Sequence, residues 1–538
     1  MATRYPATSD ARAARFRGAG LRTAVLGLAL GVCLGGAAAQ NPVKGGTLNG
    51  IVQPEPPTLM LGMNQQGPTI YVAGKIYQSL LTYSPELKPQ PELAKSWVMS
   101  PDGLTYTFEL EPNVKWHDGK PFTAEDVAFT VDKFLRKTHP RANVVLNRYV
   151  ASVNALSPTK VEFKLKEPFG PFLLLFEVST LPMVPKHIYD GTDYATNPAN
   201  QTPIGTGPFK FKEWKRGSHI HLVKNENYWK PGKPYLDEIY FRVIPDSASR
   251  ALAFEKGDVH VLRGGDVDNV DVRRLRALKG VTTTTAGWES YSPLAFMMMN
   301  NRKAPFDNVK VRQAVMHAVD KNFIASTIFF GLAKPANGPL ASTTLFNDPG
   351  LKPYPFNIAR AKELIKESGV DLTKTPVKIL SFPYGAQWER VAEYVKQGLE
   401  QIGFTVSIEP ADAGSWAKRV SDWEFDLSFN FTYQYGDPAL GVARHYLSTN
   451  IVKGSPFANN QGYSNPKVDE LLIKAASSVD MNERARLYAE FQKIAVDDVA
   501  NGFLAELQFA TLYRANIKNL VKTGIGLNET LDDAWIEK

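Results

Sequence analysis

Residues 94–127 read AKSWVMSPDGLTYTFELEPNVKWHDGKPFTAEDV, a stretch that predicts a compact unit of strands and a helix. Apolar and polar residues alternate over residues 106–110, as on a half-buried strand, and the dipeptide at 102–103 is typical of a tight turn. Thr123 with Asp126 three residues later forms a capping box that opens a helix. The sequence therefore predicts an α+β subdomain here.

The second half of the chain has a different pattern, in which strand and helix alternate. Residues 377–382 and 404–408 are expected strands, and residues 391–402 between them have the apolar spacing of a helix. Strand, helix, strand with short joints predicts a βαβ unit with parallel strands. Other expected elements are helices at 71–81, 358–368, 468–476 and 483–496 and a strand-like stretch at 503–513.

Composition places the chain among ordinary globular proteins. It has 538 residues, 43% hydrophobic and 22% charged, which argues against disorder, collagen and coiled coil. At roughly 150 residues per domain there is room for two to four domains. A single cysteine excludes an internal disulfide framework and a cysteine-based zinc site.

The first 39 residues have the three parts of a secretory signal peptide. Five arginines against one aspartate precede an apolar run from Ala24 to Leu34, and Ala37-Ala38-Ala39 follows it. The run is only about 16 Å long as a helix, too short to span a membrane. Cys33 raises the alternative of a lipoprotein, but it follows Val32 rather than a small residue, so we favour cleavage after Ala39.

Removal of residues 1–39 changes the charge of the protein. From 62 basic and 54 acidic residues it takes five arginines and one aspartate, which leaves a net charge of about +4 and no cysteine. A charge that small, with no basic run, gives no reason to expect nucleic acid as a partner. The mature chain has no apolar stretch of 18 residues, so we expect a soluble protein outside the cytoplasm.

Motifs for catalysis or cofactor binding are absent or weak. The chain has no nucleophile elbow, HExxH helix or phosphate-binding loop. A turn explains Gly205-Thr206-Gly207 better than a dinucleotide site, and likewise explains residues 116–119 better than a His–Asp catalytic pair. His219 and His221 could form a metal pair, but a polar strand face is favoured, and Met297-Met298-Met299 is expected in a core strand. We therefore expect no cofactor, no metal and no enzymatic activity.

The stretch at 94–127 closely resembles the signature of the family 5 extracytoplasmic solute-binding proteins. This family includes the dipeptide- and oligopeptide-binding proteins of ABC importers. Further matches follow in the same order as in the family, at PIGTGPF (203–209), NENYW (225–229) and PFDNVKVRQA (305–314). The resemblance covers essentially the whole mature chain.

The resemblance implies an α/β, two-lobed periplasmic binding protein of type II, cluster C-like, with an extra α+β subdomain in the first lobe. Two strands that cross between the lobes, near Tyr291 and near Leu507, would form the hinge. The implied division is a signal peptide at 1–39, lobe I at 40–82, 195–290 and 506–538, an accessory subdomain at 83–194, and lobe II at 291–505.

The implied function is the substrate-binding component of an ABC transporter. Such a protein captures a peptide or peptide-like solute in the cleft between its lobes, closes around it and docks on the permease at the inner membrane, where separate ATPase subunits supply the energy. We expect a monomer. The alternatives are the same fold with an opine, an oligosaccharide or a metal chelate as ligand, a role in sensing, or an exported hydrolase.

Peptide-binding relatives hold the ligand amine with an aspartate just before a Gly-Asp-Pro turn. That turn is residues 436–438 here, and the aspartate position falls on Gln434. A neutral amide offers no ion pair to a buried ammonium group. Dipeptide-binding relatives also place an arginine for the ligand carboxylate in the stretch that matches residues 381–384, and this chain has none there. A standard dipeptide site is therefore in doubt.

The residues left to line the cleft are aromatic or carry amides. Such a lining suits an oligopeptide held through its backbone, or a solute whose rings stack on aromatic side chains. The alternative is that several of these side chains belong to the core. The expected ligand-binding residues are Gln65, Tyr71, Tyr384, Trp388, Trp416, Phe431, Tyr433 and Gln434, with Gln66 and Tyr435 beside them.

Overall fold

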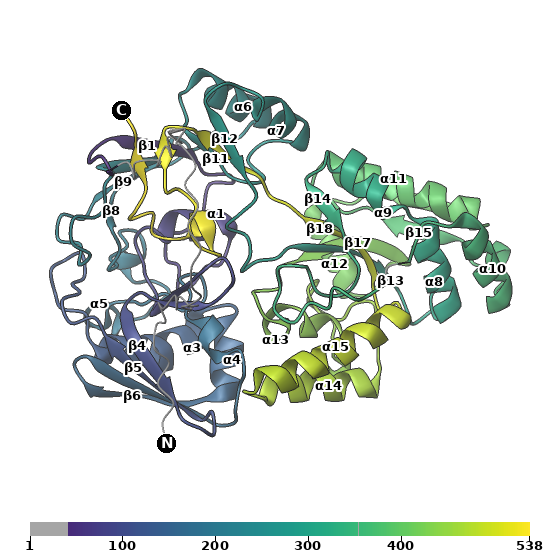
Figure 1. Ribbon diagram of the computed structural model, residues 1–538, viewed down its shortest axis with the longest axis horizontal. Helices are drawn as coiled ribbons and strands as arrows, with labels where there is room; N and C mark the ends of the chain where they lie inside the picture. The colour runs from purple at the N-terminus through teal and green to yellow at the C-terminus, as the bar shows by residue number, and fades with distance from the viewer. Residues whose placement is uncertain (1–40, 353) are drawn as a thin grey trace, which may run out of the picture.

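The computed structural model describes residues 41–352 and 354–538. The predicted signal peptide, with Cys33 and Ala39, lies outside the described residues. Three sheets organise the chain into two lobes, which lie side by side in Figure 1. A seven-stranded and a four-stranded sheet form the first lobe, and a six-stranded sheet forms the second.

Strands from three distant parts of the chain form the seven-stranded sheet. Its central strand β1 (Thr47–Ile51) pairs in parallel with strands contributed some 190 to 210 residues later. The order is β12 (Val281–Thr284), β19 (Thr511–Arg514), β11 (Val261–Leu262), β1, β10 (Glu238–Arg242), β9 (His219–Lys224) and β8 (Phe209–Lys215).

The accessory subdomain confirms the α+β pattern expected for residues 94–127. Tyr106, Phe108 and Leu110 are buried, whereas the residues between them are half-exposed. The backbone N–H of Thr123 donates to Asp126 Oδ2 over 2.9 Å, which completes the capping box of α2 (Ala124–Phe129). The sheet order is β4 (Ala94–Met99), β5 (Thr105–Leu110), β7 (Lys160–Leu165) and β6 (Val150–Ser157), all antiparallel. The apolar side chains of this subdomain belong to the same core as those of β1 and β10.

The second lobe contains the predicted βαβ unit. Strands β15 (Val377–Leu380) and β16 (Val406–Glu409) pair in parallel, and α11 (Ala386–Gln401) connects them. The order of the six strands is β14 (Ala333–Pro335), β18 (Gly502–Leu507), β13 (Leu294–Met299), β17 (Leu427–Thr432), β15 and β16. The three methionines at 297–299 are buried in β13, as expected.

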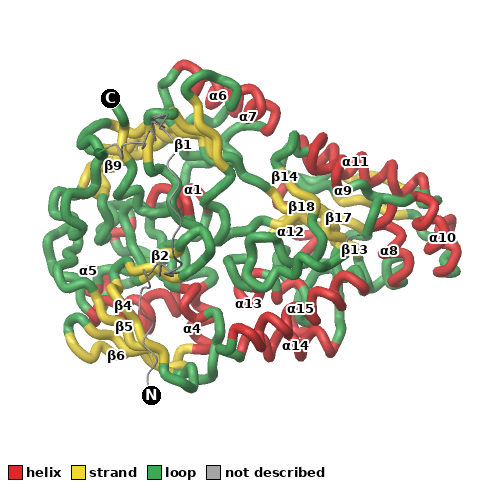
Figure 2. Tube along the Cα trace, in the orientation of Figure 1, coloured by secondary structure: helices red, strands yellow, loops and turns green. Residues whose placement is uncertain are grey.

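The remaining elements surround these sheets, and Figure 2 shows helices along both sides of the six-stranded sheet. The other helices are α1 (Gly67–Ala73), α3 (Arg136–Thr138), α4 (Ala142–Tyr149), α5 (Lys186–Tyr189), α6 (Ser247–Lys256), α7 (Asn269–Leu275), α8 (Val309–Ala318), α9 (Lys321–Phe323), α10 (Ile358–Ser368), α12 (Ala413–Ser421), α13 (Pro438–Gly441), α14 (Pro466–Ser477) and α15 (Met481–Asp497). Two short pairs complete the fold, β2 (Leu81–Tyr83) with β3 (Pro89–Pro91) and β20 (Ile517–Lys518) with β21 (Trp535–Ile536). No helix among residues 41–352 and 354–538 is long and apolar enough to cross a membrane.

Local sequence signals predicted the ends of some helices correctly but not those of others. Asn357 caps α10 through the N–H of Arg360, and Gly369 ends that helix in a left-handed conformation, as expected. The helix predicted at 71–81 is wrong in its bounds, because α1 begins earlier and ends before Gly74. A Cβ at Gly74 would lie 2.0 Å from the carbonyl oxygen of Asn528, so only glycine allows the C-terminal segment to approach the end of α1 this closely.

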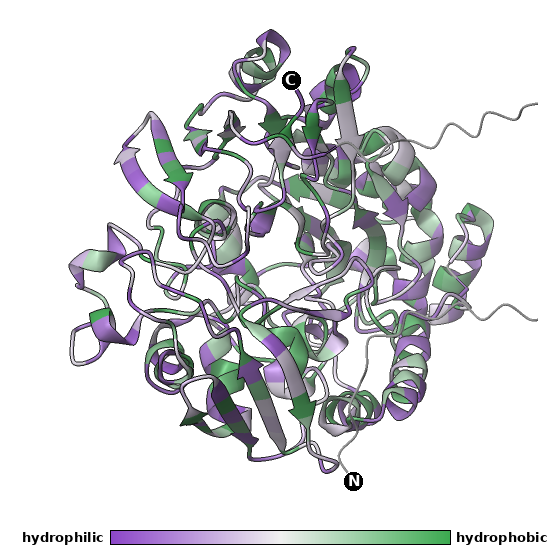
Figure 3. Ribbon diagram, turned by 60° about the vertical axis from the view of Figure 1, so that its left-hand side comes forward, coloured by the Kyte–Doolittle hydropathy of each residue, from purple (hydrophilic) through white to green (hydrophobic). Residues whose placement is uncertain are grey.

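The chain passes between the two lobes in two places. It leaves the first lobe between β12 and β13, near Tyr291, and returns between β18 and β19 (Figure 1). The stretch expected as one strand at 503–513 is therefore two strands in different sheets. Strands of the four-stranded sheet, low in the first lobe, show alternating hydrophobic and hydrophilic bands in Figure 3, as expected where one face of a sheet is buried.

Candidate functional site

Four of the predicted ligand-binding side chains gather around Phe382 in the second lobe. The ring of Phe382 lies 4.5 Å from Tyr384, 4.8 Å from Trp388, 4.9 Å from Trp416 and 6.1 Å from Phe431, measured between centroids. Trp388 and Trp416 are only 2% and 1% exposed, so both belong to the core of this lobe. Tyr384 is 48% exposed and Phe431 is half-buried, so these two rings are the accessible part of the group.

A run of aromatic rings leads from this group across to the first lobe. The ring of Phe431 lies 5.9 Å from Tyr433, Tyr433 lies 5.3 Å from Tyr291, and Tyr291 lies 5.8 Å from Trp288. Tyr433 follows β17 of the second lobe, yet it packs against the core of the first. Burial raises the pKa of the Tyr433 hydroxyl to about 12, although nearby Arg263 opposes this shift. Tyr433 therefore lies where the two lobes meet.

Arg263 and Tyr71 form the facing wall in the first lobe. The Arg263 guanidinium lies 5.3 Å from the centre of the Tyr71 ring and 5.1 Å from that of Trp288. It also donates a hydrogen bond to the carbonyl oxygen of Gly67 over 3.3 Å. Sequence reasoning missed Arg263, and its place directly after the short buried strand β11 was the signal that could have found it.

Gln65 begins a chain of polar contacts that runs from the first lobe to Tyr435 in the second. Its Nε2 donates to the carbonyl oxygen of Ser179 over 3.0 Å, and the Ser179 hydroxyl donates to Glu177. Glu177 forms an ion pair of 3.1 Å with Arg141, whose guanidinium lies 3.7 Å from the centre of the Tyr435 ring in the second lobe. Arg141 is thus a further residue that sequence reasoning did not find.

Gln434 has a different environment from its two neighbours. It is fully buried, and its Nε2 donates to the carbonyl oxygen of Pro339 while its Oε1 accepts from Ala341 N–H and the Thr344 hydroxyl. All three partners belong to the second lobe. Gln434 could contact a ligand only if some of these bonds broke, so its ligand role stays a prediction. Alternation along the chain leaves Tyr433 and Tyr435, rather than Gln434, beside the first lobe.

The Gly-Asp-Pro turn after Tyr435 is held by a buried ion pair. Asp437 Oδ1 lies 2.8 Å from Arg484 on α15 and accepts the backbone N–H of Ala439. Tyr435 itself has a positive φ of 53°, which is uncommon for a non-glycine residue and is maintained here by its surroundings. Asp437 therefore supports the turn that presents Tyr433 and Tyr435.

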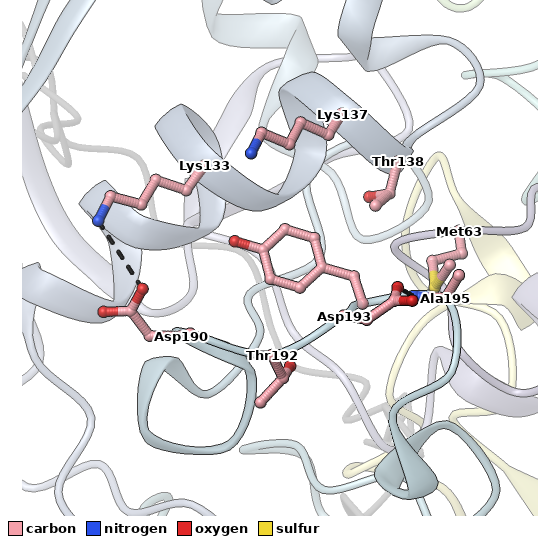
Figure 4. A pocket seen from close by; sticks show the side chains of 10 residues that line it. Met63, Lys133, Lys137, Thr138, Asp190, Thr192, Asp193 and Ala195 are labelled. Carbon is pink, nitrogen blue, oxygen red and sulfur yellow. Dashed lines mark hydrogen bonds and ion pairs between the residues drawn. The ribbon is translucent and has the colours of Figure 1, made fainter.

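A large hollow lies elsewhere, on the first lobe alone. An open depression of about 860 Å³ on the first lobe is lined by residues 133–138 and 190–195, with Lys133 and Asp190 3.7 Å apart (Figure 4). It contains none of the predicted ligand-binding residues and involves only one lobe. A smaller cavity of about 60 Å³, lined by Trp288, Phe509 and Glu506, lies beside the crossing strands. This cavity contains none of the predicted ligand-binding residues either. We therefore place the candidate site at the run of rings from Phe431 to Trp288, to which both lobes contribute.

His117 and His221, which sequence alone left as candidates for catalysis or metal binding, contact other groups of the fold. His117 Nε2 contacts the carbonyl oxygen of Gly207 at 2.9 Å, so the turn at 116–119 packs against the turn at 205–207. Burial lowers the pKa of His117 to about 4. His221 lies 2.9 Å from Glu238. Residues 41–352 and 354–538 contain no group of three or more His, Cys, Asp or Glu side chains placed to hold a metal ion.

Comparison with known proteins gives a consistent result. The family described as "Bacterial extracellular solute-binding proteins, family 5 Middle" matches residues 88–453. The glutathione-binding protein GsiB of Pectobacterium atrosepticum is 30% identical over 456 residues, which cover 84% of this chain and 86% of the relative.

Solved structures agree with the sequence relatives. The periplasmic binding protein DppA of Helicobacter pylori in complex with the peptide STSA superposes with a TM-score of 0.76 at 27% identity, over 92% of this chain and 99% of DppA. NikA of Brucella suis in complex with Fe(III)-EDTA superposes with a TM-score of 0.80 at 25% identity, over 91% of this chain and 100% of NikA.

Proposed function

Because the chain belongs to the family 5 bacterial extracellular solute-binding proteins, we propose that it captures a peptide or peptide-like solute between its lobes and delivers it to the permease of an ABC importer. The observation that carries this proposal is the run of rings from Phe431 through Tyr433 and Tyr291 to Trp288, which joins the two lobes. Aromatic faces on both sides suit a solute that is enclosed when the lobes close.

The names of the relatives support a peptide-like ligand. One relative is named for glutathione, a modified tripeptide, and the Helicobacter protein holds a tetrapeptide. The complex of NikA with Fe(III)-EDTA supports the alternative of a metal chelate in the same fold. We propose Tyr71, Tyr384, Phe431 and Tyr433 as ligand contacts, with Gln65 and Gln434 at the edges and Trp388 and Trp416 as support behind them.

The cellular role follows the same proposal. Residues 1–39 would export the chain to the periplasm, where it acts as a monomer without catalysing a reaction. The sheets support a division into lobe I (40–82, 195–290 and 506–538), an accessory subdomain (83–194) and lobe II (291–505).

Native mass spectrometry of the protein incubated with a peptide pool tests this function. A binding protein returns intact bound peptides, whereas a hydrolase returns shortened products. Tyr433→Ala should weaken binding at least about tenfold, since it removes a ring that touches both lobes. Tyr240→Ala serves as the control, because Tyr240 stacks on His221 on another strand of the first lobe. Binding that is equal in the two variants contradicts the proposed site.

A further inference from the structure

Three arginine side chains surround the interlobe run of tyrosines. Arg263 and Arg141 come from the first lobe, and Arg444 comes from the second. Arg444 donates from Nε to the carbonyl oxygen of Gly441 over 3.2 Å and from Nη2 to the hydroxyl of Thr432, at the end of β17. These bonds place its guanidinium beside the segment that presents Tyr433 and Tyr435.

Carboxylates neutralise only part of this positive charge. Glu177 pairs with Arg141, but among the described residues neither Arg263 nor Arg444 forms a salt bridge, and both bond only neutral oxygens. Asp266 lies close to Arg263, yet its carboxylate accepts the backbone N–H of Arg263 rather than the guanidinium. Burial raises the pKa of Asp266 to about 7, so it supplies only part of a negative charge at neutral pH. Among the described residues, Arg444 thus has no carboxylate partner, and Arg263 has only the partly charged Asp266 near it.

The two lobes also present like charges to each other. Arg141 lies against the Tyr435 ring. Arg444 bonds the Thr432 hydroxyl, three residues before Tyr435, so both guanidiniums lie against the segment 432–435. Burial lowers the pKa of Arg444, and the positive charge of Arg141 lowers it further. Bringing such charges together costs free energy unless an anion lies between them.

We propose, building on the function proposed above, that the solute is an anion whose carboxylate is bound between Arg444 and Arg141, with Arg263 binding a second acidic or carbonyl oxygen. Guanidinium groups suit this role because they donate paired hydrogen bonds to carboxylates. The stretch at 381–384, where the family resemblance places a carboxylate-binding arginine, contains none. The three arginines therefore supply the recognition that this stretch lacks.

The carboxylates beside the run of tyrosines also determine which end of the solute is recognised. Two positions beside the tyrosines offer no free carboxylate to a ligand amine, since Glu177 is engaged by Arg141 and Gln434 stands where the family resemblance places an aspartate. The solute is therefore recognised through its acid end rather than its amine end. Closure of the lobes depends on that acid, because it offsets the repulsion between Arg141 and Arg444.

Two chemical forms of one tripeptide pool test this inference by calorimetry on the full-length mature protein. One form is N-acetylated with a free carboxylate, and the other is C-amidated with a free amine. We expect the free acids to bind about tenfold to a hundredfold more tightly. Arg444→Gln and Arg263→Gln should each remove most of that preference. Arg486→Gln should keep it, because Arg486 is exposed on α15, in the same lobe as Arg444.

The outcomes separate this inference from the proposed function. Equal binding of the two forms, or a preference that survives Arg444→Gln, overturns the anion inference and leaves peptide binding intact. If neither form binds, peptide binding fails, and citrate then serves as the probe for the anion site. A rise in Tm of about 2 °C or more with citrate that Arg444→Gln abolishes and Arg486→Gln retains supports the inference, and no such rise overturns it.

Discussion

Replacement of Arg484 by Gln should destabilise the second lobe strongly. Arg484 on α15 and Asp437 form an ion pair of 2.8 Å, and their side chains are 1% and 0% exposed. Arg484 Nε also donates to the carbonyl oxygen of Ala475 over 2.8 Å. The substitution removes the cation and leaves the Asp437 carboxylate buried, with the N–H of Ala439 as its remaining donor among the described residues.

The size of the effect follows from this burial. Removal of one partner of a buried pair costs about 3–5 kcal/mol, because the other charge is left uncompensated. For a unit of about 200 residues, each kcal/mol lowers Tm by about 2–4 °C, so a fall of about 6–20 °C is expected. The turn that presents Tyr435 should also loosen, and ligand affinity should fall with it.

Differential scanning calorimetry of the ligand-free protein measures this change directly. Arg486→Gln, two residues along the same helix and exposed, should change the unfolding free energy by no more than about 0.5 kcal/mol. The double variant Asp437→Leu with Arg484→Met should recover part of the loss, since no charge is then left buried. If Arg484→Gln lowers Tm by no more than its exposed control, the pair does not hold the turn and the reasoning is wrong.

Three further predictions concern buried groups of the first lobe. Burial raises the pKa of Glu529 to about 8, so the free energy of unfolding falls as pH rises from about 4.5 to 8 and this carboxyl loses its proton. Glu529→Gln should therefore unfold at a higher denaturant concentration than wild type at pH 8, and this gain should disappear near pH 4.5. Burial lowers the pKa of His139 to about 3, so the contribution of the neutral imidazole to the free energy of unfolding is present above pH 6.5 and is lost on acidification. His139→Gln should therefore reduce the fall in Tm between pH 6.5 and 4. An unchanged slope would contradict this. A Cβ at Gly205 would lie 1.9 Å from the carbonyl oxygen of Ile76, so Gly205→Ala should cost at least about 3 kcal/mol in urea unfolding, whereas Gly414→Ala in α12 should be tolerated.

Signals that act within a few residues were sufficient to predict several elements. The capping box at Thr123 and the cap at Asn357 depend on hydrogen bonds between residues three apart, and the strands and helix at 377–409 have side-chain periods that are local in sequence. The family resemblance extended these elements to a two-lobed fold. The helix bounds near Gly74 could not be predicted, because the Asn528 carbonyl that restricts this glycine lies more than 450 residues away.

The site was only partly predictable for the same reason. The family resemblance, together with their aromatic character, pointed to residues 384, 388, 416, 431 and 433, and the structure brings them together in the second lobe. They did not indicate which of these rings belong to the core, because burial depends on the packing of α11 and α12 against β17. Nor did they reveal Arg263, whose position beside Tyr71 and Trp288 arises from pairing of distant strands.

The sequence by itself determined the class of protein, the two-part pattern of strands and helices, and the departure from a standard amine-binding aspartate at Gln434. The tertiary structure decided that Tyr433 rather than Gln434 lies beside the first lobe. It also decided that Arg141 packs on Tyr435 while it pairs with Glu177, and that Arg263 lies beside Tyr71 and Trp288. The physical reason is that local conformation depends on neighbouring residues, whereas the charge and shape of a site between lobes depend on groups that only folding brings together.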